Sequence, residues 1–134
     1  MKQATLFALC SAVVIAAAIT CAAQAPVNPV GVWVGLLQGQ PATTLTLSDD
    51  SGGLGGTVVL NAVTGEGRIL FSEPHLVLNP RLTGKVLLFQ VKSHRNGTNG
   101  LLDFRVVFNT DHTAQLHCEN CGDGAPVAEM TKSF

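Results

Sequence analysis

The densest cluster of reactive side chains is the segment from His117 to Gly124, which contains Cys118 and Cys121. Three chemistries are open to this Cys-x-x-Cys pair. A disulfide would pin a turn, with limited stabilisation because the closed loop is short. A redox site depends on a helix N-terminus that stabilises the thiolate, which a β-turn lacks. A zinc site with His117 or His112 needs four ligands, and the sequence holds no second Cys-x-x-Cys. We therefore expect a disulfide and no metal site.

The remaining reactive side chains form no catalytic pattern. We expect all four histidines at the surface, because none has paired metal-ligand spacing or a neighbouring nucleophile: His75, His94, His112 and His117. No serine lies in a Gly-x-Ser-x-Gly elbow. The carboxylates are scattered, and they cannot be paired without the strand order: Glu66, Glu73, Asp103, Asp111 and Glu129. We expect neither enzymatic activity nor a cofactor.

The single tryptophan lies in a Gly-Val-Trp-Val-Gly motif at positions 31–35. In a strand, alternation places Gly31, Trp33 and Gly35 on one face. Small residues beside a lone indole let it lie across the floor of a barrel, or let another backbone approach closely. Trp33 is then either the largest core residue or, with Gly31 and Gly35, part of a site for a small apolar ligand.

Residues 1–25 have the three-part layout of a secretory signal. Lys2 precedes an almost unbroken apolar and small run that ends in Ala23-Gln24-Ala25. The alternatives are lipidation at Cys21 and an uncleaved membrane anchor, because the run approaches the roughly 20 residues that span a bilayer. We expect cleavage near residue 25 and a periplasmic or secreted protein.

Removal of 25 of the 134 residues leaves 109, which suits one domain over 26–134. Without Lys2, seven basic residues face nine acidic ones, a net charge of −2, and no block of like charges is present. We therefore expect neither nucleic acid nor an anionic membrane surface as a partner. Cys118 and Cys121 are the two cysteines that remain, and such an even pair in an exported protein indicates a disulfide.

Short runs rich in Val, Leu, Phe and Thr recur about every ten residues between Gly, Asn, Asp and Pro clusters, which is typical of a β-sandwich or barrel. The expected strands cover 30–38, 43–48, 55–63, 67–72, 75–79, 82–92, 100–109, 112–118 and 126–133. Short loops favour antiparallel neighbours. We predict an all-β antiparallel up-and-down barrel of about eight strands, with a two-layer β-sandwich as the alternative.

The three residues Gly31-Val32-Trp33 resemble the Gly-x-Trp on the first strand of the lipocalin and calycin group of up-and-down barrels. The resemblance implies a basic residue on the last strand over the tryptophan. Lys132 is the nearest candidate, a lysine where arginine is usual. It also implies a small or partly filled pocket, because the chain is short for a full lipocalin. With its signal segment, the chain is similar to small, uncharacterised exported bacterial β-proteins.

Two functions of different classes fit these features. The first is a non-enzymatic module that binds a small apolar ligand in the barrel mouth near Trp33. The second is an interaction domain with a filled interior that presents a strand face or edge to a protein of the cell envelope. An internal cavity would distinguish the first from the second.

Overall fold

The computed structural model of the protein describes residues 25–50, 52–94 and 100–134. The expected signal segment lies outside the described residues except for Ala25, and so does the turn expected at Asn96-Gly97. In the part of the chain that is described, no helix is long and apolar enough to cross a membrane.

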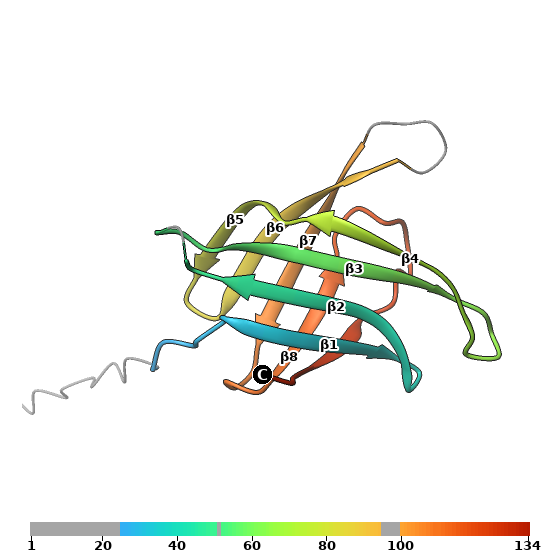
Figure 1. The fold of residues 1–134 in the computed structure, drawn as a ribbon, viewed down its shortest axis with the longest axis horizontal. Coiled ribbons are helices and arrows are strands. Elements are labelled where there is room, and N and C mark those ends of the chain that lie inside the picture. Colours follow the sequence, from blue (N-terminus) through green and yellow to red (C-terminus); the bar gives the residue numbers. More distant parts are fainter. Residues whose placement is uncertain (1–24, 51, 95–99) are drawn as a thin grey trace, which may run out of the picture.

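Nine strands make up the regular structure of the described residues (Figure 1). They are β1 (Gly31–Leu37), β2 (Gln40–Ser48), β3 (Gly55–Val63), β4 (Ile69–Leu76), β5 (Leu78–Thr83), β6 (Val86–Ser93), β7 (Gly100–Phe108), β8 (Thr113–Cys118) and β9 (Ala128–Lys132). They form one sheet in the order β4-β3-β2-β1-β9-β8-β7-β6-β5, and every pair is antiparallel. The prediction of an all-β antiparallel meander is confirmed. The two-layer sandwich is wrong, because all nine strands belong to one sheet.

The strand boundaries differ from the prediction around two prolines. Pro74 was expected to separate strands at 67–72 and 75–79, but it lies inside β4, and Pro80 lies inside β5. Both strands are at edges of the sheet, where a residue without an N–H group is tolerated. Prolines at these edges therefore continue the strands, and the break falls at Val77 instead.

A tight turn divides the long strand predicted over 82–92. Gly84 has a φ of 59°, in the left-handed region that favours glycine. Thr83 pairs with Val86 across this turn, so β5 and β6 form a hairpin. The prediction missed the turn because apolar runs begin only two residues from Gly84 on either side, at Leu82 and Val86.

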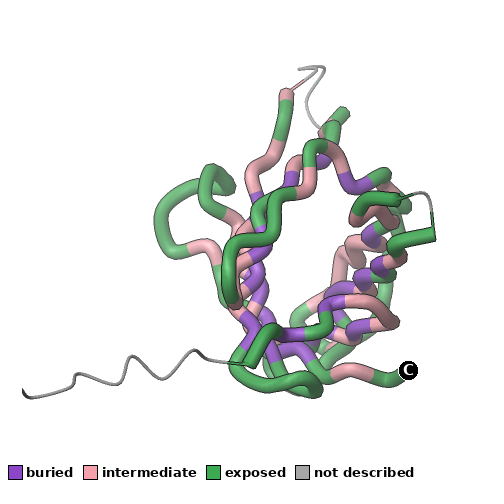
Figure 2. The backbone as a smooth tube through the Cα atoms, turned by 90° about the vertical axis from the view of Figure 1, so that its left-hand side faces the viewer, coloured by how far each residue is buried: buried purple, intermediate pink, exposed green. Residues whose placement is uncertain are grey.

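The sheet is not closed by strand pairing, which corrects the prediction of a closed barrel of about eight strands. Its two edge strands, β4 and β5, are successive in the chain and are joined by Val77 alone. β4 pairs only with β3, and β5 pairs only with β6. Figure 2 shows that the backbone nevertheless curls round into a ring. Pro74 and Pro80 cannot donate to a ladder, and Asn79 bends the chain with a φ of 49°, so the two edges remain unpaired at a seam.

The core fills the inside of the ring with side chains from alternate positions of the strands. Its members are Trp33, Leu45, Leu47, Val58, Val77, Leu87, Phe89, Val91, Phe104, Val106, Phe108, Ala114, Leu116, Ala128 and Met130, with Val27 from the lead-in. The predicted alternation in 101–110 is confirmed, because Phe104, Val106 and Phe108 are buried while Asn109 is exposed. The interior of the curled sheet is therefore apolar along much of its length.

Candidate functional site

The two ends of the ring differ: side chains fill one end, and the other end contains a cavity. The strands run up and down, so the connections at 38–39, 64–68 and 119–127 lie at one end, which we call the cavity end. The connections at 84–85 and 109–112 lie at the other, which we call the tryptophan end.

The tryptophan end is filled by side chains. Trp33 is completely buried, its ring packs against Phe108 with centroids 5.0 Å apart, and its Nε1–H donates to the carbonyl of Pro29 at 2.8 Å. Lys132 of β9 lies over the indole with its Nζ 5.3 Å from the ring centroid, and the same ammonium donates to the carbonyl of Asn28 at 3.0 Å. The position expected for a basic residue over the tryptophan is therefore occupied by Lys132.

The backbone explains the glycines of the motif that surrounds Trp33. Gly31 has a φ of 137°, and a Cβ there would overlap the carbonyl oxygen of Phe134. Gly35 faces Thr43 across the β1–β2 ladder, and a Cβ there would overlap the Cγ2 methyl of Thr43. Both glycines thus permit close approach of neighbouring groups. Gly31, Trp33 and Gly35 do not line the cavity described next, and ligand binding by them stays a prediction.

A cavity of about 270 Å³ opens at the other end of the ring. Most of its wall is apolar, and its lining includes Leu37, Ala42, Leu60, Ala62, Phe71, Leu102, Phe104, Leu116 and Ala128. Small-molecule sites in proteins have volumes of roughly 300–1,000 Å³ and apolar walls with a few polar groups. This cavity lies just below that range, which suits a small ligand.

Two ionisable side chains approach each other in the cavity wall, on β4. The Nε2 atom of His75 is 3.5 Å from Oε2 of Glu73, and both side chains face inward from alternate positions of the strand. The His75 side chain is only 11% exposed, whereas that of Glu73 is 49% exposed. The expectation of a surface histidine is therefore wrong for His75. The curling of the sheet brings an edge strand with polar inward positions beside an apolar interior.

Thr43 of β2 adds a buried polar group to the same wall. The residue is 2% exposed, and its hydroxyl has no hydrogen-bond partner among the described residues. A buried hydroxyl without a partner costs about 1–3 kcal/mol relative to a satisfied one. Thr43 therefore adds a buried polar group without a partner among the described residues to a mainly apolar wall.

Hydrogen bonds hold the two strands next to these residues in place. Asn61 of β3 lines the cavity; its Nδ2 donates to the carbonyl of Pro41 at 3.1 Å, and its Oδ1 accepts from Oγ of Ser72 at 2.7 Å. These bonds tie β4 to β3 and β3 to β2. The orientation of Glu73 and His75 is therefore set by the β3–β4 ladder and not by a flexible loop.

The cysteines meet at the rim of the cavity, after β8. Cys118 and Cys121 form a close pair with Cα atoms 5.5 Å apart, which is the separation that a disulfide requires, and both line the cavity. Asn120 fixes this segment to β7: its Oδ1 accepts from the N–H of Asp103 at 2.8 Å, and its Nδ2 donates to the carbonyl of Leu101 at 3.0 Å. The described residues hold no cluster of three or more metal-ligating side chains.

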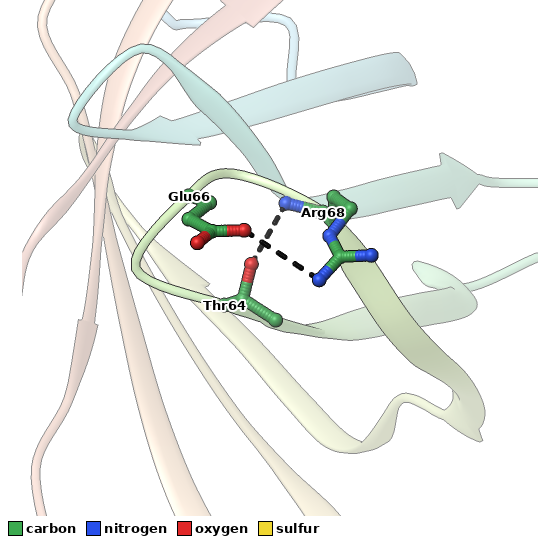
Figure 3. A network of polar contacts seen from close by, with 3 residues as sticks. All are labelled: Thr64, Glu66 and Arg68. Atoms are coloured by element: carbon green, nitrogen blue, oxygen red, sulfur yellow. Dashed lines mark hydrogen bonds and ion pairs between the residues drawn. The ribbon is translucent and has the colours of Figure 1, made fainter.

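The β3–β4 turn forms another part of the cavity end. Figure 3 shows Glu66 and Arg68 reaching toward each other across this turn, with 3.5 Å between Oε2 and Nη2. The Thr64 hydroxyl accepts from the N–H of Arg68 at 3.1 Å. The ion pair is almost fully solvated, so the backbone bonds of the turn define its shape more than the charges do.

Sequence reasoning did not single out the polar residues of this site. Glu73 and His75 alternate around Pro74, a pattern that predicted a break in the chain. The only local signal was their shared strand face, which becomes an inner face once the sheet curls. No protein-family model, no curated protein and no solved structure matches this chain. The cavity and its lining are therefore the evidence from which a function is argued.

Proposed function

We propose that the protein is an exported, non-enzymatic β-module that binds a small apolar molecule in the cavity at the end of the ring opposite Trp33. The observation that supports this proposal is the cavity of about 270 Å³, which is bounded mainly by aliphatic and aromatic side chains. Burial of apolar surface contributes roughly 25 cal/mol per Å², so such a cavity favours an apolar guest over water. The rival function, an interaction domain with a filled interior, has no use for this space.

The resemblance to lipocalins and calycins supports the same proposal. Lys132 lies over Trp33 and closes one end of the ring, as the resemblance implies, and the opposite end is the one that contains space. In this proposal β4 and β5 act as one bent strand that changes neighbours at Val77, so that the open nine-stranded sheet can surround the cavity. Cys118 and Cys121 form the disulfide that stiffens the rim.

Octan-1-ol is a suitable probe, because it is apolar and small enough for the cavity. Titration into isotopically labelled protein, followed by NMR, reports which residues change environment. We expect shifts at cavity-lining amides such as Leu60 and Leu116, and none at the indole N–H of Trp33. Shifts centred on Trp33 would favour the site predicted from the sequence motif, and the absence of any shift would favour the interaction domain.

A matched pair of variants tests whether the space itself is needed. Ala62→Phe places a ring in the cavity wall, whereas Thr57→Phe adds the same ring at an exposed position of the same strand. We expect octan-1-ol binding to be lost in the first variant and kept in the second. Equal binding by both variants would contradict the proposal.

A further inference from the structure

The charge distribution of the cavity wall narrows the class of ligand. Among the described residues that line the cavity, the ionisable side chains are Glu73 and His75, and none is a lysine or an arginine. Glu73 and His75 also line a second groove, which contains Lys92 and His94. Glu73 is therefore the acidic side chain that faces this mainly apolar wall.

Glu73 is placed where a cationic group of a ligand could approach its carboxylate with little loss of hydration. Its side chain is half-exposed at the wall, and Nε2 of His75 lies 3.5 Å from its Oε2. A cationic group beside Glu73 would keep part of its hydration while its apolar body occupies the interior. An anionic group at the same place would meet a like charge with no cation in the wall to offset it. The position of Glu73 should therefore make an amine bind more tightly than a carboxylic acid of equal size.

We propose that the ligand is a small apolar molecule that carries one protonated amine, which binds with its amine at Glu73 and its apolar body in the cavity. This rests on the proposed binding function and specifies the ligand class of the same site. Phe71 and Phe104 also line the cavity, and aromatic faces attract cations. Glu73 is the residue that determines specificity.

Three probes of equal chain length test the proposal: octylamine, octan-1-ol and octanoate. Binding is measured by calorimetry on the full protein at pH 7.5 and low salt, where the amine is protonated and the acid is ionised. We expect octylamine to bind about fivefold more tightly than octan-1-ol, the gain typical of a partly exposed ion pair, and octanoate to bind more weakly than the alcohol.

Two variants that remove the same charge complete the test. In Glu73→Gln, octylamine should fall to the affinity of octan-1-ol, while the affinity of the alcohol stays the same. In Glu66→Gln, which alters the exposed ion pair at the same end of the ring, the preference for the amine should persist. Addition of 0.5 M salt should reduce the preference by screening.

The outcomes separate this inference from the function on which it depends. If all three probes bind in the cavity with equal affinity, or octanoate binds most tightly, the amine proposal is wrong and the binding function stands. If Glu73→Gln leaves the amine preference intact, Glu73 is not its source and the proposal is again wrong. If no probe binds at all, the binding function itself fails.

Discussion

Gly35 offers the sharpest test of the packing on which the cavity wall depends. A Cβ built at Gly35 overlaps Cγ2 of Thr43, and its next neighbours are Cβ of Ala128 at 3.3 Å and Cγ of Met130 at 3.5 Å. Overpacking of this kind lowers the free energy of unfolding by about 1–3 kcal/mol. Replacing glycine by alanine also restricts the unfolded chain, which raises the free energy of unfolding by about 0.4–1 kcal/mol. We expect Gly35→Ala to lower the free energy of unfolding by about 1–2 kcal/mol. Urea denaturation followed by the fluorescence of Trp33, the single tryptophan, measures it.

The same substitution in a Thr43→Ser background identifies the atom responsible for the expected loss of stability. Thr43→Ser removes the Cγ2 methyl and keeps the hydroxyl, so Gly35→Ala in that background should be neutral or slightly stabilising. The coupling energy between the two sites is then about 2 kcal/mol, well above the additivity error of distant sites. Gly100→Ala is the control, because that strand glycine has no atom within 4 Å of its added Cβ and should tolerate alanine. Equal destabilisation by Gly35→Ala in both backgrounds would refute the reasoning.

Three further predictions concern stability. Replacement of Cys118 and Cys121 by serine should lower the unfolding free energy by about 2 kcal/mol, because a disulfide over so short a loop removes little chain entropy; an unchanged urea midpoint would exclude a structural disulfide. Lys132→Met should cost about 1–2 kcal/mol through loss of the cation over Trp33 and of its hydrogen bond, and an unaltered stability would show that neither matters. Thr43→Val should stabilise the protein by about 1 kcal/mol, because it removes the unpartnered buried hydroxyl; a loss of stability would show that the hydroxyl has a partner, such as water in the cavity.

Local pattern was sufficient to predict most of the strands. Alternation in β7 and the turn residues between the runs gave strand positions close to those observed, because both signals act over a few neighbouring residues. The exceptions were the prolines of β4 and β5 and the turn at Gly84. A proline breaks a central strand and continues an edge strand, and edge position is a property of the whole sheet.

The tryptophan end was also partly predictable. The spacing of Gly31, Trp33 and Gly35 indicated a large side chain packed beside close backbone neighbours, and the resemblance to lipocalins and calycins placed Lys132 over the indole. The sequence motif pointed to a ligand at the same place. The structure fills that end with Trp33 and Phe108 and leaves the space at the other.

The sequence by itself determined that the chain forms antiparallel strands with one apolar face, because side-chain period and turn chemistry are local. Only the tertiary structure decided that the sheet curls into a ring with a seam, that Glu73 and His75 face its interior, and that Thr43 lies beside them. These positions depend on which strands become edges and on how far the sheet twists. Both are set by contacts between residues far apart in the chain, which no window of neighbouring residues contains.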